Sequence, residues 1–101
     1  MRTDYIICAV RDKHTGLLGN VFQARNTVEL ERDMYRVVHN ERSPYKDFES
    51  DFELCILANY DIREGLSIND NIVVYKNLSD IKNLNMNDRE VFDGTEDWKE
   101  N

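Results

Sequence analysis

The sequence has few of the residues on which common catalytic and metal sites depend. Its four glycines are scattered, so there is no glycine-rich loop to hold a phosphate group. It has two histidines, and neither has a second ligand at the spacing of a zinc site, which needs three or four nitrogen or sulfur donors. No serine lies in a G-x-S-x-G nucleophile motif. We therefore expect no enzyme activity, no catalytic residues, no bound metal, no cofactor and no small-molecule substrate.

Long hydrophobic runs are also missing. The apolar stretches are only a few residues long, far short of the roughly 20 that span a membrane, and no signal-peptide pattern is present at the N-terminus. Cys8 and Cys55 both lie inside apolar runs, where a free cysteine behaves as a small hydrophobe. We expect a cytoplasmic protein with two buried thiols and no membrane contact. A disulfide between neighbouring strands is the alternative.

Positive charge is scarce in the chain as a whole. Its 101 residues include 13 Lys and Arg against 20 Asp and Glu, a formal net charge of −7. This balance excludes a protein that coats nucleic acid by bulk electrostatics, because such affinity comes from Lys and Arg. The excess is uneven, since residues 1–46 carry a net charge of +2 and residues 47–101 one of −9. The average therefore leaves room for one small phosphate-binding surface.

Apolar patterning predicts two strands on each side of one helix. Residues 5–10 and 52–60 are apolar runs typical of interior strands, and residues 17–24 and 71–76 are expected to pair beside them. The predicted fold is α+β, a four-stranded antiparallel sheet in the order strand-strand-helix-strand-strand with one helix on one face. The other face is then uncovered, so we expect a homodimer through that face or through an edge strand.

A helix is predicted over residues 27–40. Asn26 and Glu29 have the spacing of a capping box at its start. Apolar residues recur at helical spacing and form one stripe, which consists of Leu30, Met34, Val37 and Val38. A short helical turn is expected over residues 78–84, with Ser79 as its cap.

Five basic residues cluster around the longer helix. They are Arg25, Arg32, Arg36, Arg42 and Lys46. One interpretation is an ordinary solvated helix face, on which Glu29, Asp33 and Glu41 pair with the arginines. The other is a phosphate-binding strip, with Tyr35 or Tyr45 as a stacking surface for the bases of single-stranded DNA. We take these five cations as the candidate nucleic-acid-binding residues.

The last 17 residues differ from the rest of the chain. Residues 85–101 contain six acidic and two basic side chains, so we expect a domain over residues 1–84 followed by a mobile acidic tail. Phe92 and Trp98 are the large aromatic groups of this tail and the candidate partner-binding residues. Three roles remain open: a solubilising segment, an intramolecular competitor over the basic strip, or a DNA-like surface that occupies another protein's nucleic-acid site.

Several short motifs resemble one known family. They are Ala9-Val10-x-Asp12, Phe22 in the returning strand, Glu29 and Arg32 in the helix, Val38-x-Asn40 at its end, and Asp51-Phe52-x-Leu54-x-x-Leu57-x-x-Tyr60-Asp61-x-x-x-Gly65. Over residues 5–76 this pattern resembles the small non-structural protein of gokushovirus-type microviruses, tailless phages with circular single-stranded DNA. The chain differs from that family in lacking a proline-rich turn near Val21 and Phe22 and in its acidic tail.

Two functions are expected on these grounds. The resemblance implies a phage non-structural accessory protein in the host cytoplasm, acting in single-stranded DNA replication or packaging. Its partners would be single-stranded DNA, bound weakly through the five cations, or proteins of the replication and packaging machinery. The alternative is an acidic adaptor or inhibitor of a host protein, with a sheet edge or the acidic tail as its contact surface.

Overall fold

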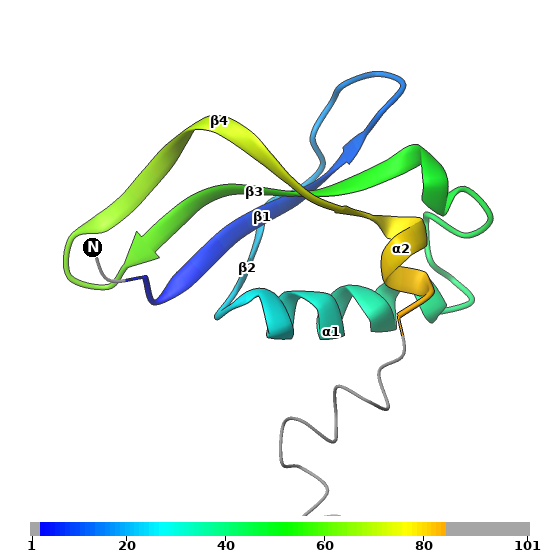
Figure 1. The fold of residues 1–101 in the computed structure, drawn as a ribbon, viewed down its shortest axis with the longest axis horizontal. Helices are drawn as coiled ribbons and strands as arrows, with labels where there is room; N and C mark the ends of the chain where they lie inside the picture. The colour runs from blue at the N-terminus through cyan, green and yellow to red at the C-terminus, as the bar shows by residue number, and fades with distance from the viewer. Residues whose placement is uncertain (1–2, 85–101) are drawn as a thin grey trace, which may run out of the picture.

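A computed structural model describes residues 3–84, which form a four-stranded antiparallel sheet with helices on one face (Figure 1). In chain order the elements are β1 (Tyr5–Asp12), β2 (Phe22–Ala24), α1 (Thr27–His39), the 3-10 turn η1 (Glu49–Asp51), β3 (Phe52–Asp61), β4 (Gly65–Asn77) and α2 (Leu78–Lys82). The strand order is β2-β1-β3-β4, and all neighbours are antiparallel. The predicted α+β fold is confirmed.

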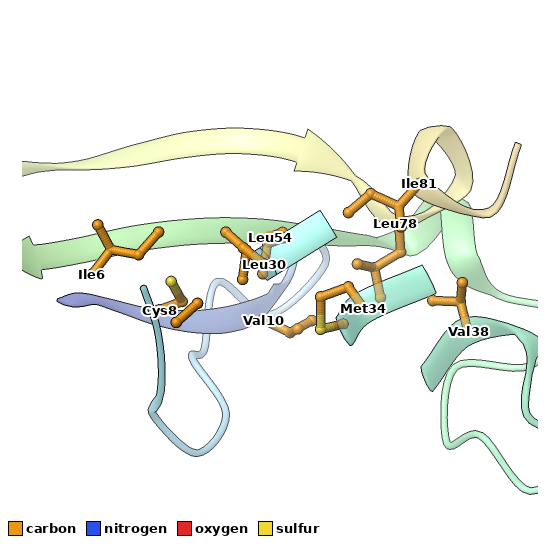
Figure 2. Close-up of a cluster of buried hydrophobic side chains, with 10 residues drawn as sticks. Ile6, Cys8, Val10, Leu30, Met34, Val38, Leu54, Leu78 and Ile81 are labelled. Carbon is orange, nitrogen blue, oxygen red and sulfur yellow. The ribbon is translucent and has the colours of Figure 1, made fainter. Parts of the chain in front are cut away.

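The core lies between the central strands β1 and β3 and the helices. Successive side chains of a strand point to opposite faces, and Ile6, Cys8 and Val10 of β1 belong to the face that meets α1. Figure 2 shows these side chains converging with those of the helices. The buried partners from β3, α1 and α2 are Leu54, Leu30, Met34, Val38, Leu78 and Ile81. The short helix α2 therefore contributes to the same core as α1.

Helix α1 begins as its sequence predicts. The Asn26 side chain accepts a hydrogen bond from the Glu29 amide at 2.8 Å, and the Glu29 carboxylate accepts from the Arg25 amide at 2.9 Å. One position of the predicted stripe is wrong, because Val37 is 38% exposed and Glu31 is buried instead. Glu31 tolerates burial because it accepts hydrogen bonds from the Lys76 ammonium, at 2.9 Å, and from the Tyr75 hydroxyl.

Strand β2 is much shorter than the predicted strand over residues 17–24. Only Phe22–Ala24 pair with β1 as a strand, and a single isolated bridge joins Leu18 to Arg11. Gly16 takes a left-handed conformation with φ of +76° at the turn. The returning segment keeps backbone hydrogen bonds with β1, from the Asp12 amide to the Leu17 carbonyl at 3.0 Å and from the Gly19 amide to the Val10 carbonyl at 2.8 Å. Residues 13–21 otherwise form a loop in which Leu17 is 70% exposed and Val21 is 64% exposed.

Strand β4 starts earlier than the predicted strand over residues 71–76. Ala58 pairs with Ile68 while Ile56 pairs with Val73, so residues 69–72 bulge out opposite a single residue of β3. This bulge holds the polar residues that interrupted the apolar pattern, which explains why the earlier half of the strand was missed. The predicted cap of α2 was also wrong, since the helix begins after Asn77 rather than Ser79.

The face of the sheet opposite α1 carries exposed apolar side chains. Residues directly paired across antiparallel strands share a face, and Leu66, Ile68 and Val74 of β4 pair with residues of β3 on this open face. Their side chains are 55%, 73% and 47% exposed, so the predicted uncovered apolar surface is present in the described residues. The expected homodimer through this surface stays a prediction.

Candidate nucleic-acid interface

The five candidate cations follow the outer side and both ends of α1. Arg32 and Arg36 lie one helical turn apart, on the side opposite the buried stripe. Arg25 precedes the helix, and Arg42 and Lys46 lie in the loop after it. Because a helix of 13 residues is about 20 Å long, Arg25 is separated from the last two by the length of α1. The structure arranges the cations as an extended strip rather than one cluster.

Three of these five cations have no carboxylate partner among the described residues. Arg36 Nη1 lies 3.6 Å from Asp33 Oδ1, but the two side chains are 71% and 49% exposed, so water screens the pair. Arg25, Arg42 and Lys46 are exposed, and no carboxylate of residues 3–84 lies within ion-pair distance of them. The expected helix-face pairing therefore occurs at Arg36 and fails at these three.

Local hydrogen bonds shape the loop that carries Arg42 and Lys46. The Asn40 side chain accepts from the Arg42 amide at 2.8 Å, and the Ser43 hydroxyl accepts from the Tyr45 amide at 3.1 Å. The Lys46 amide donates to the Ser43 carbonyl at 3.2 Å. These bonds hold the backbone through turns and leave both cationic side chains in solvent.

The two tyrosines proposed as stacking surfaces have different environments. The ring of Tyr35 lies 4.2 Å from that of His39, whose Nε2 is 2.9 Å from the Lys82 carbonyl oxygen, so Tyr35 helps to join α1 to α2. Tyr45 packs edge-on against Phe52 with ring centroids 4.9 Å apart, and burial raises the pKa of its hydroxyl. Tyr45 also borders a cavity.

That cavity is an apolar groove beneath the 13–21 loop, which we call the loop groove. One part, next to α1, has a volume of about 310 Å³ and an adjoining part about 320 Å³, and the two share Val10, Gly19 and Tyr45. The part next to α1 is lined by Val10, Gly19, Asn20, Phe22, Asp33, Met34, Val37 and Tyr45. Strand β1, the 13–21 loop, helix α1 and the loop after it all contribute to its walls.

Sequence reasoning did not predict the loop groove. The apolar residues Leu17 and Leu18 were assigned to a strand, and Val37 was assigned to the core. All three line the loop groove instead. A signal was nevertheless present, because Gly16 and Gly19 interrupt the strand pattern. Phe92 and Trp98, with the rest of the predicted tail, lie outside the described residues.

The histidines and cysteines form no metal centre in the described part of the chain. His14 Nε2 lies 3.1 Å from Asp51 Oδ1, and within residues 3–84 no three His, Cys, Asp or Glu side chains are grouped to hold a metal ion. Cys8 and Cys55 are free and buried on opposite faces of the sheet, since Cys55 pairs with Ala9, the neighbour of Cys8. That placement excludes a disulfide between them. Burial raises the pKa of the Cys8 thiol to about 11.

Comparison with known proteins places the chain in a family. No described helix meets the length and hydropathy of a membrane-spanning segment. No curated protein and no solved structure matches the chain. One family model does match, and it is described as the Phage ORF5 protein. The match runs over residues 5–81, from the first residue of β1 into α2, and so includes the sheet, α1 and the loop groove. The chain therefore belongs to the Phage ORF5 protein family.

Proposed function

We propose that this phage protein is a non-structural accessory protein that binds single-stranded DNA weakly during viral DNA replication or packaging. The observation that carries the proposal is the set of exposed cations around α1. Arg25, Arg42 and Lys46 have no carboxylate of residues 3–84 within ion-pair distance. Such side chains bind phosphates without first breaking an internal ion pair.

The proposal also accounts for the protein's acidity. A small strip of cations gives modest affinity, while the net charge of −7 disfavours the indiscriminate coating of nucleic acid. The family resemblance to accessory proteins of single-stranded DNA phages supports the same reading. Binding of this kind is expected to depend steeply on salt, because phosphate contacts release counterions.

The test measures binding of a labelled single strand to the full chain by fluorescence anisotropy over a range of salt concentrations. The double variant Arg42→Ala/Lys46→Ala is expected to weaken binding at low salt. It should also lower the slope of log affinity against log salt by about 1.4, because each lost phosphate contact removes about 0.7 for single strands.

Arg63→Ala is the matched control for this experiment. Arg63 is also exposed and has no carboxylate partner in the described residues, but it lies in the turn between β3 and β4, far from the loop after α1 (Figure 1). We expect this variant to bind DNA almost as the unaltered protein does. Absence of binding at low salt, with or without residues 85–101, would refute the proposal.

A second candidate function is protein–protein contact through the open face of the sheet. Leu66, Ile68 and Val74 expose apolar surface on the edge strand β4, which soluble proteins usually cover. We propose a second copy of the chain as the occupant, because a twofold axis brings the same apolar residues of two copies together. Light scattering should then give a dimer mass that Ile68→Lys converts to a monomer. A strictly monomeric unaltered protein at high concentration would exclude this candidate.

A further inference from the structure

The loop groove has features that suit a flat aromatic ligand with a polar edge. Its walls are mainly apolar, with Phe22, Met34 and Val37 among them, and Tyr45 contributes an aromatic ring. The polar side chains of Asn20 and Asp33 line the same part of the groove as these residues, and Asp12 and Thr15 line the adjoining part. A purely aliphatic ligand would leave the Asp33 carboxylate without a hydrogen-bond donor on the ligand side, at a cost in free energy. A ligand with donors on its edge avoids that cost.

The charges beside the groove point to an anionic attachment on such a ligand. The Arg36 guanidinium lies 3.6 Å from Asp33, which places a cation at the groove wall. Lys46 follows Tyr45 directly in the chain, and both Lys46 and Arg42 lack a carboxylate partner among residues 3–84. Arg36 also offsets the negative charge of Asp33, the carboxylate that lines the same part of the groove as Phe22 and Met34.

We propose that the loop groove binds one unstacked nucleobase of single-stranded DNA, with the flanking phosphates held by Arg36, Arg42 and Lys46. The inference rests on the proposed single-stranded DNA binding and adds a base-binding site to it. Stacking and apolar contact hold the face of the base. Asp33 accepts a hydrogen bond from an exocyclic amino group, as carboxylates do from cytosine N4, so cytosine is favoured over thymine.

Gly19 offers a way to fill the groove without removing any charge. It lines both parts of the groove, its φ is not in the left-handed region, and a Cβ added there meets only the Val10 carbonyl oxygen at 3.5 Å. Gly19→Leu therefore places a bulky side chain at the groove wall, whereas Gly19→Ala adds only a methyl group and serves as its control. Val37→Trp fills the groove from α1, where Val37 is 38% exposed, and provides a second blocking variant.

The experiment compares two labelled probes of equal length, an oligomer of deoxycytidine and an abasic sugar-phosphate strand. The full chain is expected to bind the base-containing strand about tenfold more tightly at one salt concentration, within the range of base stacking on aromatic side chains. Gly19→Leu and Val37→Trp should reduce this ratio to near one while leaving the salt slope unchanged. Gly19→Ala should keep it.

Each other outcome overturns the inference in a distinguishable way. Failure of the unaltered protein to bind either strand refutes the proposed function together with the groove site. Equal binding of both strands by the unaltered protein leaves phosphate binding standing and refutes the base site. A base preference that survives in Gly19→Leu and Val37→Trp places base recognition elsewhere and refutes the groove site.

Discussion

Basic side chains in two regions of this protein meet carboxylates in different ways. On the sheet and α2, three of them form close ion pairs, Arg11 with Glu53 at 2.7 Å, Lys76 with Glu31 at 2.9 Å, and Lys82 with Glu49 at 3.3 Å. On α1, Arg36 lies farther from its partner, 3.6 Å from Asp33, and both side chains are well exposed to solvent.

The difference teaches where basic residues serve the fold and where they are available to a ligand. The sheet pairs join residues far apart in the chain, and their carboxylates are 14% exposed or less, so they connect elements in a partly desolvated setting. The side chains of Arg25, Arg42 and Lys46 form no ion pair with residues 3–84. Their removal should leave the fold intact, which makes this contrast testable.

The largest effect is expected for Lys76→Met. The change keeps an apolar stem but removes the ammonium from Glu31, whose side chain is 2% exposed. A buried carboxylate that loses its cation is costly, and we expect the free energy of unfolding to fall by about 2 kcal/mol in urea denaturation. Arg42→Met, the control at an exposed site, should change it by less than about 0.5 kcal/mol. Equal losses in the two variants would contradict the contrast.

A smaller effect is expected for Arg11→Met. Arg11 Nε donates a hydrogen bond to Glu53 Oε2 at 2.8 Å, and Arg11 Nη2 lies 2.7 Å from the same oxygen. The Arg11 side chain is 26% exposed and the Glu53 side chain 14%. Loss of this pair should lower the unfolding free energy by about 1 kcal/mol, measured by urea denaturation. Arg36→Met breaks an exposed pair and should cost about 0.5 kcal/mol or less. A larger loss for Arg36→Met would reverse the assignment of the two regions.

Arg36 and Arg11 should rank in the opposite order when DNA binding is measured, because Arg36 lies on the cationic strip and Arg11 does not. Arg36→Gln is expected to lower affinity for a single strand a few-fold and to reduce the salt slope by about 0.7, as one lost phosphate contact would. Arg11→Met, on the opposite face of the sheet, should leave both quantities unchanged. Fluorescence anisotropy at several salt concentrations measures them, and a comparable loss in Arg11→Met would show that binding is not confined to the strip around α1.

The smallest effect concerns acid stability and the Glu49–Lys82 pair. The pKa of the Glu49 carboxyl lies below its ordinary value, first because a backbone amide donates to it and further because Lys82 is nearby, with burial acting in the opposite direction. A lowered folded-state pKa means that the stabilisation is present above the unfolded pKa and is lost as pH falls through the folded pKa. Glu49→Gln should therefore flatten the fall in stability on acidification below pH 4.5, measured by urea denaturation at several pH values. An unchanged profile would exclude Glu49 as a contributor.

Local patterns predicted much of the fold because their physical causes are local. Asn26 and Glu29 start α1 through bonds that span three or four residues, and the apolar runs of β1 and β3 mark interior strands wherever they occur. The errors have nonlocal causes. Val37 was assigned to the core from its spacing, but Glu31 is buried in its place, and its carboxylate accepts a hydrogen bond from Lys76, 45 residues later in the chain.

The candidate site was predicted in part for the same reason. The five cations could be named from their positions around one helix, and the strip they form is a local consequence of α1 and its ends. The loop groove could not be predicted, because Gly19, Met34 and Tyr45 belong to three separate segments, the 13–21 loop, α1 and the loop after α1, that come together only in the folded protein. A cavity depends on which surfaces meet, and spacing along the chain does not specify that.

By itself, the sequence determined the number and order of strands and helix, the start of α1 and the uneven distribution of charge. Only the tertiary structure decided which cations find carboxylates. Arg11 and Glu53 are 42 residues apart, and they meet because β1 and β3 pair in one particular register. Ion pairing, burial and cavities depend on distances across the fold, whereas helix capping and strand patterns depend on neighbours along the chain.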